Sequence, residues 1–509
     1  MTKPADRVVM NTGILYMKMI LTVGISLYTT RAVLLALGQS DFGLYNLVAG
    51  VVALLSFLNA AMSTSTQRFL SVSQGSGNAQ KQSVIFSNSL LVHIILSVVL
   101  AVSFLILEPF LFDHFLNIDI ERVNVAKVIY YFMIASVVFS VLSVPFVASL
   151  NARENMLWIA IVGIVEVLLK LGIALSIPYF TGDKLIYYGL LIVIVNFISF
   201  ILYMSFCLKK YDECSLNIKK QWSPSLSKEL TSFAGWNLFG ALCGLGRTQG
   251  LAIILNLFFG TIVNAAYGIA NQVAGQMNFF SATMLRALNP QIMKSAGAKD
   301  WVRMKSLSMT ASKFGFFLLA IFAVPCIFEM EEILSVWLKH TPDYAIEFCR
   351  LLLVGILLNQ LTIGLQSALQ AVGKIRVYQS IVGGLLLLNL PIAYFLLRSG
   401  LSAYIVLVSY ILIEFFACII RILIAKRIGV VDVNLYLKKV ILPIIITLVP
   451  VLSIGVLIIQ LNIECNFLLI CGGLCITYVV FIWLIGLDKS EQQYVKNIFS
   501  SVKEKLWKS

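Results

Sequence analysis

Long, mainly apolar runs alternate with short polar loops along the whole chain. A run of about 20 residues, at a rise of about 1.5 Å per residue, is long enough to cross about 30 Å of hydrocarbon as a helix. A membrane-spanning β-strand would instead show segments of about ten residues with alternating polarity. The pattern therefore predicts an all-α integral membrane protein of about 14 transmembrane helices. The predicted spans are residues 9–31, 43–63, 84–107, 124–148, 157–180, 185–207, 230–256, 261–288, 307–329, 345–369, 378–397, 402–424, 440–460 and 465–487.

The composition leads to the same class of protein. Hydrophobic residues make up 60% of the chain and charged residues only 12%, with a mean hydropathy of +0.93. In a soluble protein the net charge of +14 would favour nucleic acid as a partner. Here the basic residues lie mainly in the loops between apolar runs, so we expect membrane lipids as partners and no nucleic acid. The nine cysteines form no CxxC pair and no Cys/His cluster, and the sequence predicts neither a metal site nor a cofactor.

The orientation follows from the basic residues in the loops. With the N-terminus in the cytoplasm, roughly 26 Lys and Arg residues fall in inside loops and about 5 in outside loops. This asymmetry would collapse if one span were missing or added. It predicts a multi-pass protein of the inner (cytoplasmic) membrane with both termini in the cytoplasm.

A short sequence repeat divides the predicted spans into two halves. The kernels Phe42-Gly43-Leu44-Tyr45-Asn46 and Tyr267-Gly268-Ile269-Ala270-Asn271 share the order aromatic, Gly, aliphatic, any residue, Asn. Each kernel opens the second span of its half and is followed by a small basic loop. Because six is an even number of helices, the two six-helix lobes would be parallel repeats, related by a pseudo-two-fold axis along the membrane normal. Gly43, Asn46, Gly268 and Asn271 are the predicted repeat or gate positions.

The repeat also predicts the domain organisation. We expect an N-lobe of six helices over residues 1–210 and a basic cytoplasmic linker over residues 211–228. A C-lobe of six helices would cover residues 229–430, and residues 431–509 would hold two further helices and a basic cytoplasmic tail.

Two blocks of the sequence resemble polysaccharide flippases of the Wzx type. The first-half block consists of Tyr28-Thr-Thr-Arg31, Leu37-Gly38, Asp41-Phe-Gly-Leu-Tyr-Asn46 and Thr66-Gln-Arg-Phe-Leu70. The second-half block consists of Gln249-Gly250, Leu255-Asn256, Phe259-Gly260, Asn264-Ala-Ala-Tyr-Gly-Ile-Ala270 and Asn289-Pro-Gln-Ile292. Flippases of this type belong to the multidrug/oligosaccharidyl-lipid/polysaccharide (MOP) exporter superfamily.

The resemblance implies both a fold and a cargo. The fold would be a two-lobed, V-shaped helical bundle with a central cavity that works by alternating access. The cargo would be an undecaprenyl-diphosphate-linked oligosaccharide, moved from the cytoplasmic to the periplasmic leaflet. Other polysaccharide-assembly proteins would be further partners.

Charged residues inside the spans are the candidate functional residues, because a charge at this depth costs several kcal/mol and usually faces a cavity or a partner. Arg247, Lys18, Lys170 and Arg31 could together attract a compact dianionic diphosphate. The alternative is that each is paired or reaches an interface with its charged end. Lys170 could be neutralised by Glu166, one helical turn away. For Lys313 and Arg421 we expect the charged ends to reach the inner interface.

Energy coupling has two candidate residues. Glu166 and Glu414 are the acids that lie most clearly inside spans, and either could carry a proton or help to hold sodium. Salt bridges from Glu166 to Lys170 and from Glu414 to Arg421 are the alternative.

Three other functions are alternatives to a flippase for oligosaccharides. A membrane-embedded glycosyltransferase or polymerase would need a large periplasmic loop, whereas the predicted outside loops have about 17 residues at most. No GxSxG, HExxH, Walker A or Rossmann motif is present, so the sequence predicts that the protein is not an enzyme. A multidrug or cation antiporter of the same superfamily would need an acidic cavity. A flippase for the peptidoglycan precursor shares the preference for a cationic cavity and stays an alternative.

Overall fold

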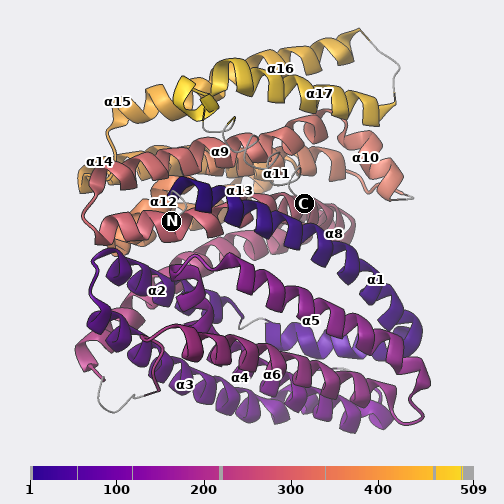
Figure 1. The fold of residues 1–509 in the computed structure, drawn as a ribbon. Helices are drawn as coiled ribbons and strands as arrows, with labels where there is room; N and C mark the ends of the chain where they lie inside the picture. Colours follow the sequence, from indigo (N-terminus) through magenta and orange to yellow (C-terminus); the bar gives the residue numbers. More distant parts are fainter. Residues whose placement is uncertain are drawn as a thin grey trace, which may run out of the picture. The chain divides into compact units, whose positions relative to one another are not determined.

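The computed structural model describes residues 4–53, 56–116, 118–216, 222–338, 340–461, 466–493 and 496. All regular secondary structure in these residues is helical (Figure 1). The predicted all-α membrane protein is thereby confirmed. Most of the predicted basic tail, and Lys219 and Lys220 of the predicted linker, lie outside the described residues.

Two helices are much longer than a membrane span, and each is broken by one glycine. Helix α1 (Pro4–Ala53) has non-helical backbone angles at Gly38, where φ is 81° and ψ is 169°. Helix α8 (Pro224–Gly297) has them at Gly260, where φ is 76° and ψ is −161°. Positive φ combined with extended ψ is a conformation that is essentially limited to glycine. The chain therefore makes the same turn, with the same residue type, at corresponding places in its two halves.

Each of the two repeat kernels contains an equivalent hydrogen bond. The Asn46 side chain donates to the Phe42 carbonyl at 2.9 Å, and the Asn271 side chain donates to the Tyr267 carbonyl at 2.8 Å. In each kernel the asparagine thus bonds to the aromatic residue four positions earlier. The shared sequence pattern corresponds to a shared local structure.

The structure has fewer candidate membrane spans than predicted when each continuous helix is counted as one span. Among the described residues, 11 helices are long and apolar enough to cross a membrane. A twelfth span would consist of α11 (Ala345–Gln360) and α12 (Ile363–Val372), which are bent by 44° at their junction. The predicted number of about 14 is not confirmed. It differs mainly because α1 and α8 each run through a glycine break that the hydropathy pattern reads as a loop.

The chain divides into two compact units, which we describe separately. The N-terminal unit comprises Met10–Leu238, and the C-terminal unit comprises Phe239–Ser509 together with Met1–Val9. The boundary lies inside α8. The four-part division predicted from the sequence stays a prediction.

The N-terminal unit is centred on α4 (Val123–Ala152). This helix packs against α2 (Ser56–Gly75), α3 (Ala79–Phe110) and α6 (Lys184–Lys210), and α5 (Met156–Ser176) packs against α6 (Figure 1). The buried Tyr130 of α4 illustrates this packing, since its hydroxyl donates to the Phe104 carbonyl of α3 at 2.8 Å. Burial of apolar side chains along α4 holds the unit together.

The beginning of the predicted linker is bound to the N-terminal unit. The Arg153 guanidinium, just after α4, donates two hydrogen bonds of 2.7 Å to the Glu213 carboxylate. The Asn155 side chain donates to the Tyr211 hydroxyl at 3.0 Å. The hydrogen bonds to Glu213 raise the pKa of Arg153 above its usual value, so this cation keeps its charge.

The C-terminal unit has two packing centres. Helix α9 (Trp301–Phe328) packs against α11, α12 and the final pair, α16 (Leu442–Gln460) and α17 (Phe467–Phe481), which lie side by side in Figure 1. Helix α14 (Ile405–Ile428) packs against α11 and α13 (Ile375–Arg398). Helix α14 carries two buried charged residues, Glu414 and Arg421.

Candidate functional site

Three charged side chains meet inside the C-terminal unit. Arg247 of α8 donates from Nη1 to Glu414 Oε2 at 3.1 Å, and Arg421 donates from Nη1 to Glu414 Oε1 at 2.9 Å. Their side-chain exposures are 9% for Arg247, 1% for Glu414 and 2% for Arg421. We call these residues the Arg247–Glu414–Arg421 triad. With two cations and one anion, it has a net charge of +1.

Polar and aromatic neighbours complete the surroundings of the triad. The Asn359 side chain of α11 donates to Glu414 Oε1 at 2.7 Å. The Arg247 guanidinium carbon lies 4.1 Å from the centre of the Tyr410 ring, a cation–π contact. Arg421 Nη1 also lies 3.3 Å from the Thr362 hydroxyl. Glu414 thus accepts hydrogen bonds from both arginines and from Asn359.

Each arginine retains a buried N–H group for which the described residues offer no hydrogen-bond acceptor. The Nε atoms of Arg247 and Arg421 are both in this state. A buried unsatisfied donor costs about 1–3 kcal/mol, and more when the group is charged. An anionic group that accepted these hydrogen bonds would remove the cost and balance the net charge. The triad therefore has the chemistry of an anion-binding group.

Local sequence explains why these three residues meet. Glu414 and Arg421 are two helical turns apart on α14 and so lie on one face of it. Around Arg247, Gly250 lets α8 approach α13, because a Cβ atom at this position would lie 2.6 Å from a methyl group of Leu390. The α8 backbone stays helical on both sides of Arg247 and breaks only at Gly260. Gly250 therefore serves close packing, whereas Gly244 has open space around it.

The N-terminal unit holds a second group of charges, on α1 and α5. Lys170 donates to Glu166 Oε1 at 2.6 Å across one turn of α5, and both side chains are about one-third exposed. The side chain of Lys18 on α1 crosses α5 at Gly163, where a Cβ atom would lie 2.4 Å from Lys18 Cε and 2.5 Å from its Nζ. Gly163, Glu166 and Lys170 lie on one face of α5. We call Lys18, Glu166 and Lys170 the α1–α5 group; its net charge is also +1.

The remaining predicted residues lie elsewhere. Arg31 is exposed on α1, toward the Gly38 break. Gly43 and Gly268 are ordinary helical glycines in open surroundings. The unusual backbone is at Gly38 and Gly260, which the resemblance blocks contain but which the repeat kernels do not. Whether any predicted site residue contacts a substrate stays a prediction.

Lys313 and Arg421 are both buried within the protein, with side chains that are 5% and 2% exposed. That their charged ends reach the inner membrane interface stays a prediction. Lys313 donates to Glu491 Oε2 at 2.6 Å, and Glu491 follows the last membrane helix. In both cases a carboxylate brought close by folding offsets the cost of burying the cation.

One charged cluster was not predicted at all. Arg122, at the start of α4, donates from Nη1 to Asp183 Oδ2 at 2.6 Å and from Nη2 to Asp41. Asp183 is also the N-cap of α6, since its Oδ1 accepts from the backbone N–H groups of Leu185 and Ile186. Asp41 belongs to one of the resemblance blocks, but no local pattern marks its partner.

Two protein-family models match the chain. The family model described as "Polysaccharide biosynthesis protein" matches residues 8–295, and the model described as "MatE" matches residues 249–395. No curated protein matches the chain.

Several solved structures of transporters are similar to the chain. A MATE transporter in its bent conformation has a TM-score of 0.73 and 14% identity, covering 84% of this chain and 98% of its own. The same kind of transporter in its straight conformation has a TM-score of 0.71 and 15% identity, with coverages of 84% and 96%. A MOP superfamily transporter from Pyrococcus furiosus, described with a binding pocket of reverse polarity, has a TM-score of 0.71 and 14% identity, with coverages of 84% and 96%. At these identities the likeness shows the fold.

Proposed function

The chain belongs to the polysaccharide biosynthesis protein family, and we propose that it moves an undecaprenyl-diphosphate-linked oligosaccharide from the cytoplasmic to the periplasmic leaflet of the bacterial inner membrane. At the coarser level it is a multi-pass membrane transporter of the MOP superfamily. The families and the similar structures are transporters, which fits the prediction that the chain is not an enzyme.

The observation that carries the proposal is the net positive charge of the buried Arg247–Glu414–Arg421 triad. Burial of an excess cation is costly unless an anion compensates it. A diphosphate is a compact dianion, and a guanidinium group presents its donors in a planar fork that suits phosphate oxygens. The unpartnered Nε of Arg247 is one donor that a phosphate could use.

Glu414 would then act as a resident counter-ion. It stabilises both arginines while no cargo is present, and it makes one hydrogen bond with Arg247. A diphosphate that approached Arg247 would compete with this single bond. The cost of releasing Arg247 is moderate because Glu414 keeps Arg421 and Asn359 as partners.

The α1–α5 group supports the same cargo. Lys18 and Lys170 outnumber Glu166, so this group also favours an anion. Arg31, exposed farther along α1, would add a weaker attraction. The sugars would be held by hydrogen bonds, and the lipid tail would stay in the bilayer.

Glu166 and Glu414 are the residues that would couple transport to a proton or to sodium. Each carboxylate has a basic partner. Protonation of either one would raise the net charge of its group by one and strengthen the attraction for a diphosphate. A proton taken up by Glu414 would therefore favour cargo binding.

A cation antiporter and a peptidoglycan-precursor flippase are the rival functions. Both charged groups would repel an organic cation, which disfavours the antiporter. The peptidoglycan precursor shares the diphosphate and is separated from oligosaccharide cargo only by experiment.

The test uses a host whose surface polysaccharide depends on this chain. Arg247→Ala and Lys18→Ala should abolish the polysaccharide while immunoblots show normal protein in the membrane. Arg247→Lys should restore part of it because the charge remains. Lys439→Ala, which removes an exposed cation on the surface, is the matched control and should be silent. Normal polysaccharide in both alanine variants and in the double variant would overturn the proposal, and lost resistance to organic cations would favour the antiporter.

A further inference from the structure

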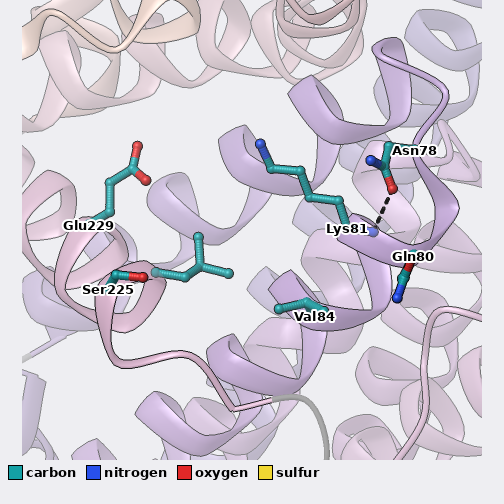
Figure 2. Close-up of a pocket in the computed structure, with 7 residues that line it drawn as sticks. Asn78, Gln80, Lys81, Val84, Ser225 and Glu229 are labelled. Carbon is teal, nitrogen blue, oxygen red and sulfur yellow. Dashed lines mark hydrogen bonds between the residues drawn. The ribbon is translucent and has the colours of Figure 1, made fainter.

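A cavity of about 420 Å³ lies at one end of the N-terminal unit, between the first turns of α3 and α8 (Figure 2). Sites for small ligands have volumes of about 300–1,000 Å³. Its walls are polar and apolar in nearly equal measure. The lining residues are Asn78, Gln80, Lys81, Val84, Ser225, Leu226 and Glu229. The loop charges predict that this end of the unit faces the cytoplasm.

Hydrogen bonds connect the two walls of the cavity, α3 and the start of α8. Asn88 of α3 accepts hydrogen bonds from the Ser223 backbone N–H and the Ser227 hydroxyl, both at 2.9 Å. The buried Ser65 of α2 donates to the Leu230 carbonyl of α8 at 2.8 Å. These bonds fix the start of α8 beside α3. The cavity is therefore a formed part of the fold.

The charges of the cavity are separated. Lys81 and Glu229 stand on opposite walls in Figure 2. Among the described residues Lys81 forms no salt bridge. Glu229 acts electrostatically on Arg68, whose guanidinium carbon lies 4.5 Å from the Phe69 ring centre and 4.8 Å from that of Phe233. Within the described part of the chain, Lys81 thus has no ion-pair partner, and Glu229 already has a basic neighbour in Arg68.

The helix ends add to this positive character. The Asn78 side chain caps α3 by accepting the Lys81 backbone N–H at 2.8 Å, and other first-turn N–H groups have no partner within the helix. The first turns of α3 and α8 both line the cavity, so the positive ends of two helix dipoles lie beside Lys81. Anions bind readily in such surroundings.

We propose that this cavity is a loading site that binds the phosphate groups of a diphosphate-linked sugar before the cargo reaches the charges inside the membrane. This inference rests on the proposed function. Lys81 and the first-turn N–H groups would contact the phosphate oxygens. Glu229, Ser225 and Gln80 on the surrounding walls would bond to sugar hydroxyl groups.

The test measures pyrophosphate binding to the full chain, purified in nanodiscs of zwitterionic phosphatidylcholine, by calorimetry. Lys81→Ala should weaken binding about tenfold or more, as expected for loss of a charge-assisted hydrogen bond. Glu229→Gln should strengthen binding because it removes the nearby negative charge. Ser225→Trp, which fills the cavity without changing its charge, should also abolish binding. Lys228→Ala, which removes an exposed neighbouring cation that does not line the cavity, should bind as the unchanged chain does.

Each outcome decides for or against the loading site. Absence of pyrophosphate binding to the unchanged chain, or equal binding by Lys81→Ala, would overturn it and leave the flippase proposal to its own test. Loss of binding in nanodiscs that contain phosphatidylglycerol would show that a membrane phospholipid occupies the cavity, and would also overturn it. Surface polysaccharide that stays normal in Lys81→Ala despite lost binding would contradict a loading role. Reduced polysaccharide together with lost binding supports it.

Discussion

Arg247 and Glu414 are 167 residues apart in the sequence, and their side chains form a 3.1 Å ion pair inside the C-terminal unit. The same carboxylate also holds Arg421. One acid therefore balances two buried guanidinium groups, and this arrangement has consequences for stability.

Glu414→Gln should destabilise the chain more than Arg247→Met or Arg421→Met. The loss of Glu414 leaves two buried cations unpaired, at a cost of about 3–5 kcal/mol, whereas the loss of one arginine leaves the carboxylate paired with the other. Thermal unfolding in detergent, followed by fluorescence-detected size exclusion, would rank the variants. Glu166→Gln breaks an ion pair that is one-third exposed and should cost under about 1 kcal/mol. If Glu414→Gln unfolded no earlier than Glu166→Gln, the assignment of the triad would be wrong.

Alanine substitutions should lower the stability of the chain at Gly38 and Gly260 and raise it at Gly43 and Gly268. Gly38→Ala and Gly260→Ala place a Cβ atom at positive φ with extended ψ and should each cost about 1–3 kcal/mol. Gly43→Ala and Gly268→Ala place one in open space on a helix and should stabilise by about 0.5–1 kcal/mol. Unfolding temperatures of the four variants check this, and equal shifts for the two pairs would contradict it.

Gly163→Ala should displace Lys18 without unfolding the chain. The new methyl group would meet the flexible end of the Lys18 side chain, which can move aside at small cost. If Lys18 contacts the cargo, surface polysaccharide should fall while the unfolding temperature changes little. Gly172→Ala, on the same helix and with open space around it, is the control: it should leave the polysaccharide unchanged and stabilise the chain by about 0.5–1 kcal/mol, as at the other open helical glycines. Normal polysaccharide in Gly163→Ala would argue against a role for the position of Lys18.

Asp183 both caps α6 and forms an ion pair with Arg122, and two variants can separate these contributions to stability. Asp183→Asn should keep the N-cap of α6 and lose only the ion pair with Arg122, because asparagine is also a good cap. Asp183→Ala should lose both and cost about 0.5–2 kcal/mol more. In an Arg122→Gln background the ion pair is already absent, so Asp183→Asn should become nearly neutral. Unfolding measurements on the double variant test this coupling, and additive effects would refute it.

Much of the architecture could be predicted from local patterns. Apolar runs and basic loops predicted a helical membrane protein, because each span must satisfy its own backbone hydrogen bonds in lipid. The repeat kernels predicted that the two halves share a local structure, and Asn46 and Asn271 do make the same hydrogen bond. The close spacing of Glu166 and Lys170 on α5 likewise made their ion pair a predictable alternative.

The sequence by itself thus determined the class of protein, its helices and its duplicated local structure, since these depend on residues within one or two helical turns. Only the tertiary structure decided the partners of charges that lie far apart in the sequence. Arg247 pairs with Glu414, Lys313 with Glu491 and Arg122 with Asp41 and Asp183, across separations that no local pattern encodes. The physical reason is that a buried charge is tolerated only beside its counter-charge, and which counter-charge is near depends on how distant helices pack.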